Sequence, residues 1–113
     1  YDLHPVVVGY GQAASWGVGL SALANVLRNY IFNHTQPDDI IMFTDATDVI
    51  FQGGEHDIVD RYLDMERRYG RELFYNADTK CTNPCEHNEL ALIQKTSSVW
   101  LYLNSGIYIG RSR

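Results

Sequence analysis

An apolar run that ends in two aspartates constrains the fold of this 113-residue chain more than any other feature of its sequence. The run Asp39–Thr44 reads Asp-Ile-Ile-Met-Phe-Thr and lacks the alternation of polar and apolar residues that is typical of a half-exposed strand. It therefore predicts a strand that is buried on both faces, as in a parallel sheet covered by helices. Asp45 and Asp48 follow it, so their carboxylates are expected at the carboxyl end of this strand.

Strand and helix patterns alternate along the rest of the chain. β-Branched and aromatic runs are typical of strands, and apolar residues at three- and four-residue spacing are typical of one face of a helix. This order predicts an α/β fold with a mostly parallel sheet flanked by helices, in which ligands bind beyond the carboxyl ends of the strands. The further predicted strands are Pro5–Val8, Leu73–Ala77, Trp100–Leu103 and Ile107–Ile109, and the predicted helices are Ser21–Phe32 and His56–Tyr69, the second ended by Gly70.

The composition of the chain excludes several classes of protein. Hydrophobic residues make up 45% of the sequence, which excludes disordered and fibrous classes. A net charge of -5, with nine scattered Lys and Arg residues, argues against a nucleic-acid partner, since phosphate binding needs clustered basic side chains. No apolar run approaches the ~20 residues that span a bilayer, so we expect no membrane segment in these residues.

Asp45 and Asp48 are the candidate metal ligands. Two carboxylates three positions apart across a turn can converge on one hard cation, and oxygen ligands suit magnesium or manganese. Such a cation usually takes its other ligands from water and substrate phosphates. The spacing by itself favours an Asx turn or a helix cap, but the buried strand before the pair and the apolar segment Val49–Phe51 after it shift the balance to the metal site.

Polar residues at other predicted strand ends are candidate ligand contacts. The Asn104 and Ser105 side chains can bond sugar hydroxyls, and Gly106 indicates close backbone approach or a positive φ; a polar hairpin turn is the alternative. Asp78 offers another carboxylate to the same edge of the sheet, or acts as a turn residue. Trp16 stands in a Gly-rich loop, where it either stacks on a base or sugar ring or belongs to the core.

Two sequence features favour the secretory pathway. Cys81 and Cys85 are close enough to form a local disulfide in an oxidising compartment, although free thiols or other partners fit the spacing as well. Asn33 begins an Asn-His-Thr triplet, which is an acceptor pattern for N-glycosylation. We therefore expect the lumen of the endoplasmic reticulum or Golgi.

Three ordered blocks of the sequence resemble the glycosyltransferase domain of procollagen lysyl hydroxylases, and related domains occur in collagen galactosyltransferase-like enzymes. Trp16 falls where that family has a tryptophan in the loop after its second strand. The similarity covers nearly the whole chain, in order and at matching intervals. The blocks are Asp39–Phe51 followed by Gly-Gly, Phe74–Asp78 with Cys81 soon after, and Leu101–Gly110, which carries the family's Asn-Ser-Gly segment.

The resemblance implies a GT-A-like (Rossmann-like) fold and transfer of a hexose from a UDP-sugar, with Mn²⁺ or Mg²⁺ as the cation. The implied acceptor is a protein, such as a hydroxylysine of a collagen-like chain. By this resemblance, residues 1–113 form a single partial domain, incomplete at both ends, with a uridine-binding strand expected before Tyr1 and a third metal ligand after Arg113. It assigns Asp45 and Asp48 to the metal, and Trp16, Asp78, Asn104, Ser105 and Gly106 to the vicinity of the donor.

The sequence also departs from the family pattern. Gly17–Ala22 lacks the lysine that helps to hold the donor in the family, Ile107 replaces a second glycine, and Cys81 begins Cys-Thr-Asn-Pro instead of Cys-Trp-Pro. These departures keep open a catalytically degenerate domain with a structural or protein-binding role. A haloacid-dehalogenase-like phosphatase is disfavoured, because its second aspartate lies two positions after the first, whereas Asp48 lies three positions after Asp45.

Overall fold

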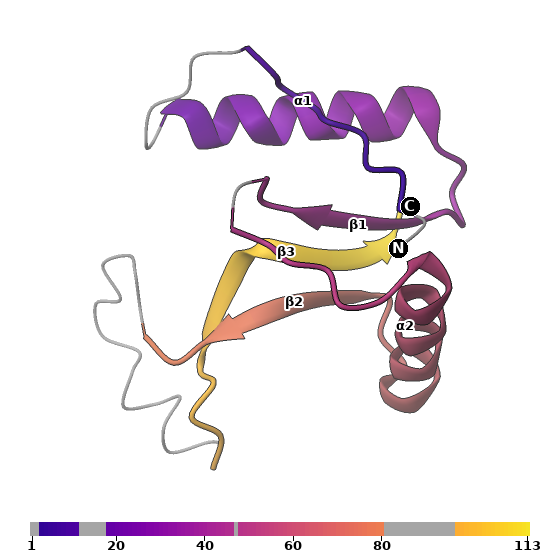
Figure 1. Ribbon diagram of the computed structural model, residues 1–113, viewed down its shortest axis with the longest axis vertical. Coiled ribbons are helices and arrows are strands. Elements are labelled where there is room, and N and C mark those ends of the chain that lie inside the picture. The colour runs from indigo at the N-terminus through magenta and orange to yellow at the C-terminus, as the bar shows by residue number, and fades with distance from the viewer. Residues whose placement is uncertain (1–2, 12–17, 47, 81–96) are drawn as a thin grey trace.

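Two helices and three strands make up the regular structure of the computed structural model, which describes residues 3–11, 18–46, 48–80 and 97–113 (Figure 1). None of the described helices is long and apolar enough to span a membrane. The elements, in chain order, are α1 (Val18–His34), β1 (Ile40–Thr44), α2 (Glu55–Tyr69), β2 (Leu73–Asp78) and β3 (Tyr102–Arg111).

The three strands form one sheet in the order β1-β3-β2, with β3 in the centre. Both ladders are antiparallel, and Met42 pairs with Ile109 while Phe74 pairs with the same residue from the other side. The prediction of a mostly parallel sheet is therefore wrong for the described strands. β1 and β2 do run in the same direction and are joined through α2, but β3 runs between them in the opposite direction and separates them.

The ends of both helices and of strands β1 and β2 lie within three residues of their predicted positions. Two other predictions are wrong. Residues 5–8 form no strand, and Val6 and Val7 are 60% and 66% exposed, because no described strand pairs with this segment. The two strands predicted around Asn104 are a single strand, β3, which accommodates the polar residues without a hairpin turn.

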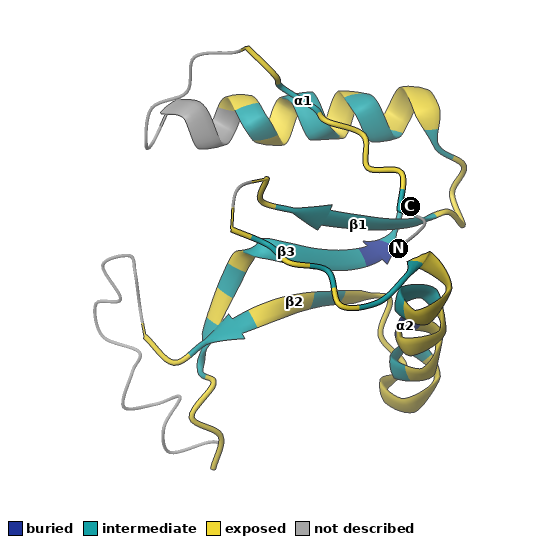
Figure 2. Cartoon of the chain, viewed as in Figure 1, coloured by how far each residue is buried: buried dark blue, intermediate teal, exposed yellow. Residues whose placement is uncertain are grey.

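The two faces of the sheet carry different partners, because side chains alternate along each strand. On one face, Phe43 and Tyr108 stack with ring centroids 4.9 Å apart, and Tyr75 lies 5.2 Å from Tyr108 on the other side. Tyr108 also borders an apolar hollow of about 280 Å³ that α1 lines with Leu27 and Ile31. Helix α1 half-buries residues along this side and exposes the other (Figure 2).

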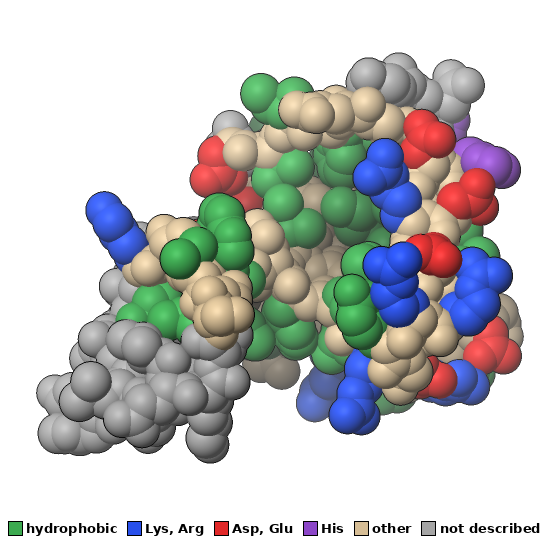
Figure 3. Space-filling view, turned by 90° about the horizontal axis from the view of Figure 1, so that it is seen from below, with side chains coloured by type: hydrophobic (Ala, Val, Ile, Leu, Met, Phe, Trp, Pro, Cys, Tyr) green, Lys and Arg blue, Asp and Glu red, His purple; other side chains and the backbone are tan. Residues whose placement is uncertain are grey.

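The opposite face of the sheet packs against α2. Phe74 meets Tyr62 and Tyr69 of this helix in edge-to-face contacts at 6.0 and 6.3 Å. Tyr62 is the one large side chain that is fully buried among the described residues. Its hydroxyl lies 2.9 Å from the carbonyl oxygen of Glu72 and 3.1 Å from Glu66 Oε1, so the buried polar group is satisfied. Figure 3 views the molecule from below the orientation of Figure 1, and on this face hydrophobic side chains gather in a hollow beside charged side chains.

Helix α2 begins and ends as its sequence predicts. Glu55 and Asp57 lie in the first turn and Arg67 and Arg68 in the last, so both ends complement the helix dipole. Gly70 has φ 60° and donates its N–H to the Glu66 carbonyl oxygen at 2.9 Å. The left-handed conformation at this position favours glycine, which confirms the predicted helix end.

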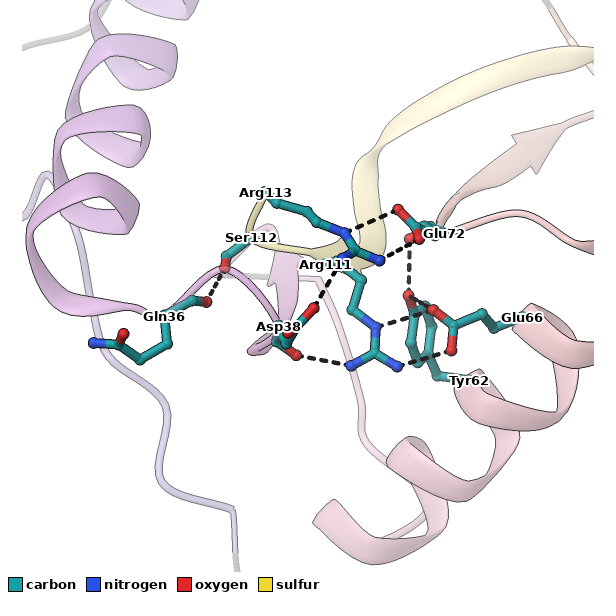
Figure 4. Close-up of polar contacts among 8 residues, drawn as sticks. All are labelled: Gln36, Asp38, Tyr62, Glu66, Glu72, Arg111, Ser112 and Arg113. Atoms are coloured by element: carbon teal, nitrogen blue, oxygen red, sulfur yellow. Dashed lines mark hydrogen bonds and ion pairs between the residues drawn. The ribbon is translucent and has the colours of Figure 1, made fainter.

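A network of charged residues fastens the end of β3 to α2 and to the turn before β1 (Figure 4). Arg111 donates two hydrogen bonds to the Glu66 carboxylate, at 2.9 and 2.8 Å, and a third to the carbonyl oxygen of Asp38 at 2.8 Å. Arg113 bridges the carboxylates of Asp38 and Glu72. This network joins residues from three parts of the chain. It therefore fixes the carboxyl end of β3, whereas the polar residues of β3 lie nearer its amino end.

The Arg111–Glu66 pair makes the stability of the fold depend on pH. Hydrogen bonds from Arg111 hold the pKa of the Glu66 carboxyl below its ordinary value. A carboxyl group whose pKa is depressed by folding stabilises the folded state at pH values above its unfolded pKa, which is about 4.3 for Glu. This stabilisation is lost as the pH falls through the lower pKa of the folded state. We therefore expect the urea midpoint of unfolding to fall as the pH is lowered from about 5 to about 3.

Glu66→Gln is expected to flatten this part of the pH profile, whereas Glu55→Gln, at an exposed position in the first turn of the same helix, is expected to change it less, because it loses only an interaction with the helix dipole. Urea titrations of the three proteins across the acid range measure the difference. An equally steep profile in Glu66→Gln would show that other carboxyl groups cause the acid sensitivity.

Candidate functional site

The candidate site lies where β3 changes its partner strand. Residues Ile107–Arg111 pair with β1, and Tyr108–Gly110 also pair with β2. The register with β2 then slips between Tyr75 and Asn76, so that Asn76 pairs with Asn104 and residues 105–107 of β3 have no partner on β2. Figure 1 shows β3 bending away from β1 at this point. Register shifts of this kind bend a strand and change the direction of its side chains, and they are frequent next to active sites.

A chain of three hydrogen bonds joins the ends of β1 and β2 through this part of β3. Asp45, directly after β1, donates its backbone N–H to the Gly106 carbonyl oxygen at 2.7 Å. The backbone N–H of Gly106 donates to Asn104 Oδ1 at 2.7 Å, and Asn104 Nδ2 donates to Asp78 Oδ2 at 2.8 Å. The structure thus brings together four of the residues that the sequence singled out.

The carboxylate of Asp45 lies over Gly106. A Cβ added to this glycine would lie 2.8 Å from Asp45 Oδ2 and 3.0 Å from Asn104 Oδ1, so the absence of a side chain makes room for both oxygen atoms. Asp45 is exposed, and its carboxylate has no hydrogen bond or ion pair within the described part of the chain. It is therefore available to a ligand that approaches this edge of the sheet.

Asp48 and Ser105 are less closely tied to this group. Both are exposed, and no contact joins either side chain to Asp45, Asn104 or Asp78 among the described residues. Asp48 lies three positions after Asp45, on the loop that leads towards α2. The structure places Ser105 within β3, directly beside Gly106 in the chain.

The donor atoms of this site suit a hard cation that is only partly held by protein. Across residues 3–11, 18–46, 48–80 and 97–113, no group of three or more His, Cys, Asp or Glu side chains is arranged to hold a metal ion. Carboxylate oxygens, such as those of Asp45 and Asp48, are ligands of the kind that Mg²⁺ and Mn²⁺ prefer. A cation held by one or two carboxylates completes its shell with water and substrate phosphates, which is consistent with an exposed Asp45.

The remaining predicted residues have no part in the described site. Trp16, Cys81 and Cys85 lie outside the described residues. Asn33 is exposed in the last turn of α1, where Nδ2 donates to the Asn29 carbonyl oxygen at 2.7 Å. The contact between Asp78 and Asn104 was not predicted, and its one signal in the sequence is the polar interruption of an apolar run.

Comparison with protein families identifies the chain. A family model described as the PLOD GT domain, where GT stands for glycosyltransferase, matches residues 2–113. No curated protein and no solved structure matched the sequence. The matched segment includes β1, the two aspartates after it and the polar residues of β3. The chain therefore belongs to the PLOD glycosyltransferase domain family.

Proposed function

We propose that the protein transfers a hexose from a UDP-sugar to an acceptor with the help of a divalent cation. The observation that carries this proposal is the position of the Asp45 carboxylate over Gly106 at the carboxyl end of β1, where it has no hydrogen bond or ion pair with any described residue. Membership of a glycosyltransferase family supplies the class of reaction. The rigid strand beneath Asp45 supplies a fixed position for its carboxylate.

Each residue of the site has a proposed role. Asp45 and Asp48 hold Mn²⁺ or Mg²⁺, which when bound stabilises the negative charge that develops on a diphosphate leaving group. Asn104 and Ser105 provide amide and hydroxyl groups for the hydroxyls of the sugar, and Trp16 stacks on a ring of the donor. Gly106 lets the donor and the Asp45 carboxylate approach the backbone closely.

A protein acceptor of the collagen type, presented in the secretory pathway, is part of the same proposal. It is supported by the family match and by the Asn33 acceptor pattern. The identity of the acceptor residue follows only from the resemblance to procollagen lysyl hydroxylases.

Donor binding and turnover in the full-length protein test the proposal. We expect calorimetric titration with UDP-hexoses to show binding that requires Mn²⁺ or Mg²⁺ and disappears in excess chelator. We also expect cation-stimulated release of UDP from at least one donor. Absence of both binding and UDP release across a panel of donors would contradict the proposal and favour a degenerate domain with a structural or protein-binding role.

Substitution of Gly106 tests whether the close approach at this residue matters. In Gly106→Ala, the new Cβ displaces the Asp45 carboxylate, so we expect kcat/KM for the donor to fall by about 10-fold or more, since small displacements of reacting groups have large effects. The obstructing atoms are the ends of side chains, so the free energy of unfolding should change by less than about 1 kcal/mol.

Gly110→Ala is the matched control on the same strand. Its Cβ would lie 2.9 Å from the backbone carbonyl oxygen of Glu72 and 2.9 Å from Leu73 Cδ1, so we expect a loss of stability of about 1–3 kcal/mol from overpacking. Urea unfolding and initial-rate kinetics of both variants separate the two effects. Full donor turnover in Gly106→Ala would show that the Asp45 carboxylate acts from another position.

Glycosylation of Asn33 tests the proposed compartment. Because Asn33 is exposed, a glycan is accommodated on the surface without disturbing the sheet. Expression through the secretory pathway of a eukaryotic host is expected to give a band that shifts to lower mass with an N-glycosidase. The shift should be lost in Asn33→Gln and retained in Asn29→Gln, and an unmodified wild-type chain would contradict this part of the proposal.

A further inference from the structure

We propose that Asp78 is a positioning residue, which fixes the side chain of Asn104 and through it the backbone of Gly106 beside Asp45. It is then neither a metal ligand nor a direct contact of the donor. The inference rests on the proposed function of this site. It changes the role expected for Asp78, whose carboxylate the sequence offered to the donor itself.

The two ends of the Asn104 amide are both engaged within the protein. Nδ2 donates to Asp78 Oδ2 at 2.8 Å, and Oδ1 accepts the backbone N–H of Gly106 at 2.7 Å. A carboxylate can only accept and a backbone N–H can only donate, so one orientation of the amide satisfies both partners. Asp78 therefore selects the orientation in which Oδ1 faces Gly106.

This arrangement replaces backbone pairing that β3 lacks. Residues 105–107 have no partner on β2, so the ladder does not hold this segment on that side. Within β3, Asn104 Oδ1 accepts the backbone N–H of Gly106, which has no partner on β2. The bond from Asn104 Nδ2 to Asp78 Oδ2 then ties this segment to the end of β2. Without the carboxylate of Asp78, the amide of Asn104 loses the partner that orients it.

The effect reaches Asp45 through the backbone. The Gly106 carbonyl oxygen accepts the N–H of Asp45 at 2.7 Å, and the Asp45 carboxylate lies over the Cα of the same glycine. Three consecutive hydrogen bonds thus connect Asp78 to Asp45 without direct contact between the two carboxylates. Asp78 and Asn104 are half-buried, whereas Asp45 is exposed, which fits a supporting role for the first two and a ligand-facing role for the third.

Paired substitutions in the full-length protein test this inference. Asp78→Asn keeps a side-chain oxygen that can accept from Asn104, so we expect donor kcat/KM to stay within about 3-fold of wild type. Asp78→Ala removes the acceptor, and we expect a fall of about 10-fold or more, mainly in kcat, because Gly106 and Asp45 are no longer held in place. Adding Asp78→Ala to Asn104→Ala should lower kcat/KM little further, because Asp78 acts through Asn104.

Backbone hydrogen exchange provides a readout that does not depend on activity. In the protein without donor, peptides that contain Gly106 should exchange faster in Asp78→Ala than in wild type and at the wild-type rate in Asp78→Asn. Affinity for Mn²⁺ should stay near the wild-type value in Asp78→Asn, which keeps the bond to Asn104 but carries no charge, and should fall in Asp78→Ala, where Asp45 is less firmly held. If transferase activity is absent, the exchange data still decide the positioning role, so failure of the two proposals can be distinguished.

Two results would overturn the inference. Equal loss of kcat/KM in Asp78→Asn and Asp78→Ala would show that the charge of Asp78 is itself required, as for a ligand. Unchanged exchange at Gly106 in Asp78→Ala would show that Asn104 keeps its orientation without Asp78.

Discussion

Asp45→Asn and Asp45→Ala are expected to lower kcat/KM for the donor by at least ~100-fold, which corresponds to about 2.7 kcal/mol of transition-state stabilisation. Under the proposed function, these substitutions remove a charged oxygen ligand from a cation that has few protein ligands. The carboxylate is exposed and makes no hydrogen bond or ion pair within the described residues, so its removal should leave the free energy of unfolding nearly unchanged. A large kinetic effect without a stability effect is the signature of a ligand-facing group.

The measurement combines donor kinetics, Mn²⁺ titration and urea unfolding of the same proteins. Asp60→Asn is the matched control, because Asp60 is an exposed aspartate on α2 whose Oδ2 lies 3.2 Å from His56 Nδ1, away from the candidate site. We expect Asp60→Asn to bind Mn²⁺ and turn over the donor as the wild type does. Cation-dependent donor binding that survives in Asp45→Ala would remove Asp45 from the metal site.

The largest effect on stability is expected at Tyr62. Its side chain is 0% exposed, packs edge-to-face against Phe74, and lies beneath the guanidinium of Arg111, which is 5.6 Å from the ring centroid. Truncation of a buried aromatic side chain creates a cavity and typically costs about 3–5 kcal/mol, so we expect Tyr62→Ala to lose about this much. A loss of this size is a large fraction of the stability of a small domain.

Two further variants separate the ring from the hydroxyl. Tyr62→Phe keeps the ring and loses only the bonds to Glu66 and Glu72, so we expect a loss of about 1 kcal/mol. Tyr69→Ala removes an aromatic side chain that contacts the same Phe74 but is 59% exposed, and we expect a loss of about 1 kcal/mol or less. A similar loss in Tyr62→Ala and Tyr69→Ala, measured by urea unfolding, would show that Tyr62 does not anchor α2.

The elements that could be predicted from the sequence are those whose pattern is local. Apolar spacing and a glycine at position 70 determine helix α2 within single residues, because helix hydrogen bonds and helix caps involve neighbours in the chain. Local patterns also predict strands β1 and β2 within one residue, and α1 within three residues of its observed ends. Pro5–Val8 shows the limit of such patterns: β-branched residues favour a strand only where another strand pairs with them.

The arrangement of the sheet and the inner contacts of the site depend on distant parts of the chain. An apolar run indicates that a strand is buried, but it does not indicate which strand lies beside it or in which direction. The sequence therefore could not show that β3 separates β1 from β2. It predicted that Asp45, Asp78 and Asn104 face one edge, whereas the bond between Asp78 and Asn104 spans 26 positions and depends on a slip in register.

The central position of β3 also determines the order in which the sheet can form. β1 and β2 pair with β3 and not with each other, so neither ladder exists before Tyr102–Arg111 has been added to the growing chain. Helix α2 can form earlier from local interactions, but β1 and β2 on either side of it have no partner among the described strands until β3 is made. Contacts between residues far apart in sequence slow folding, so the sheet of this domain is expected to form late, with its final described strand as the limiting element.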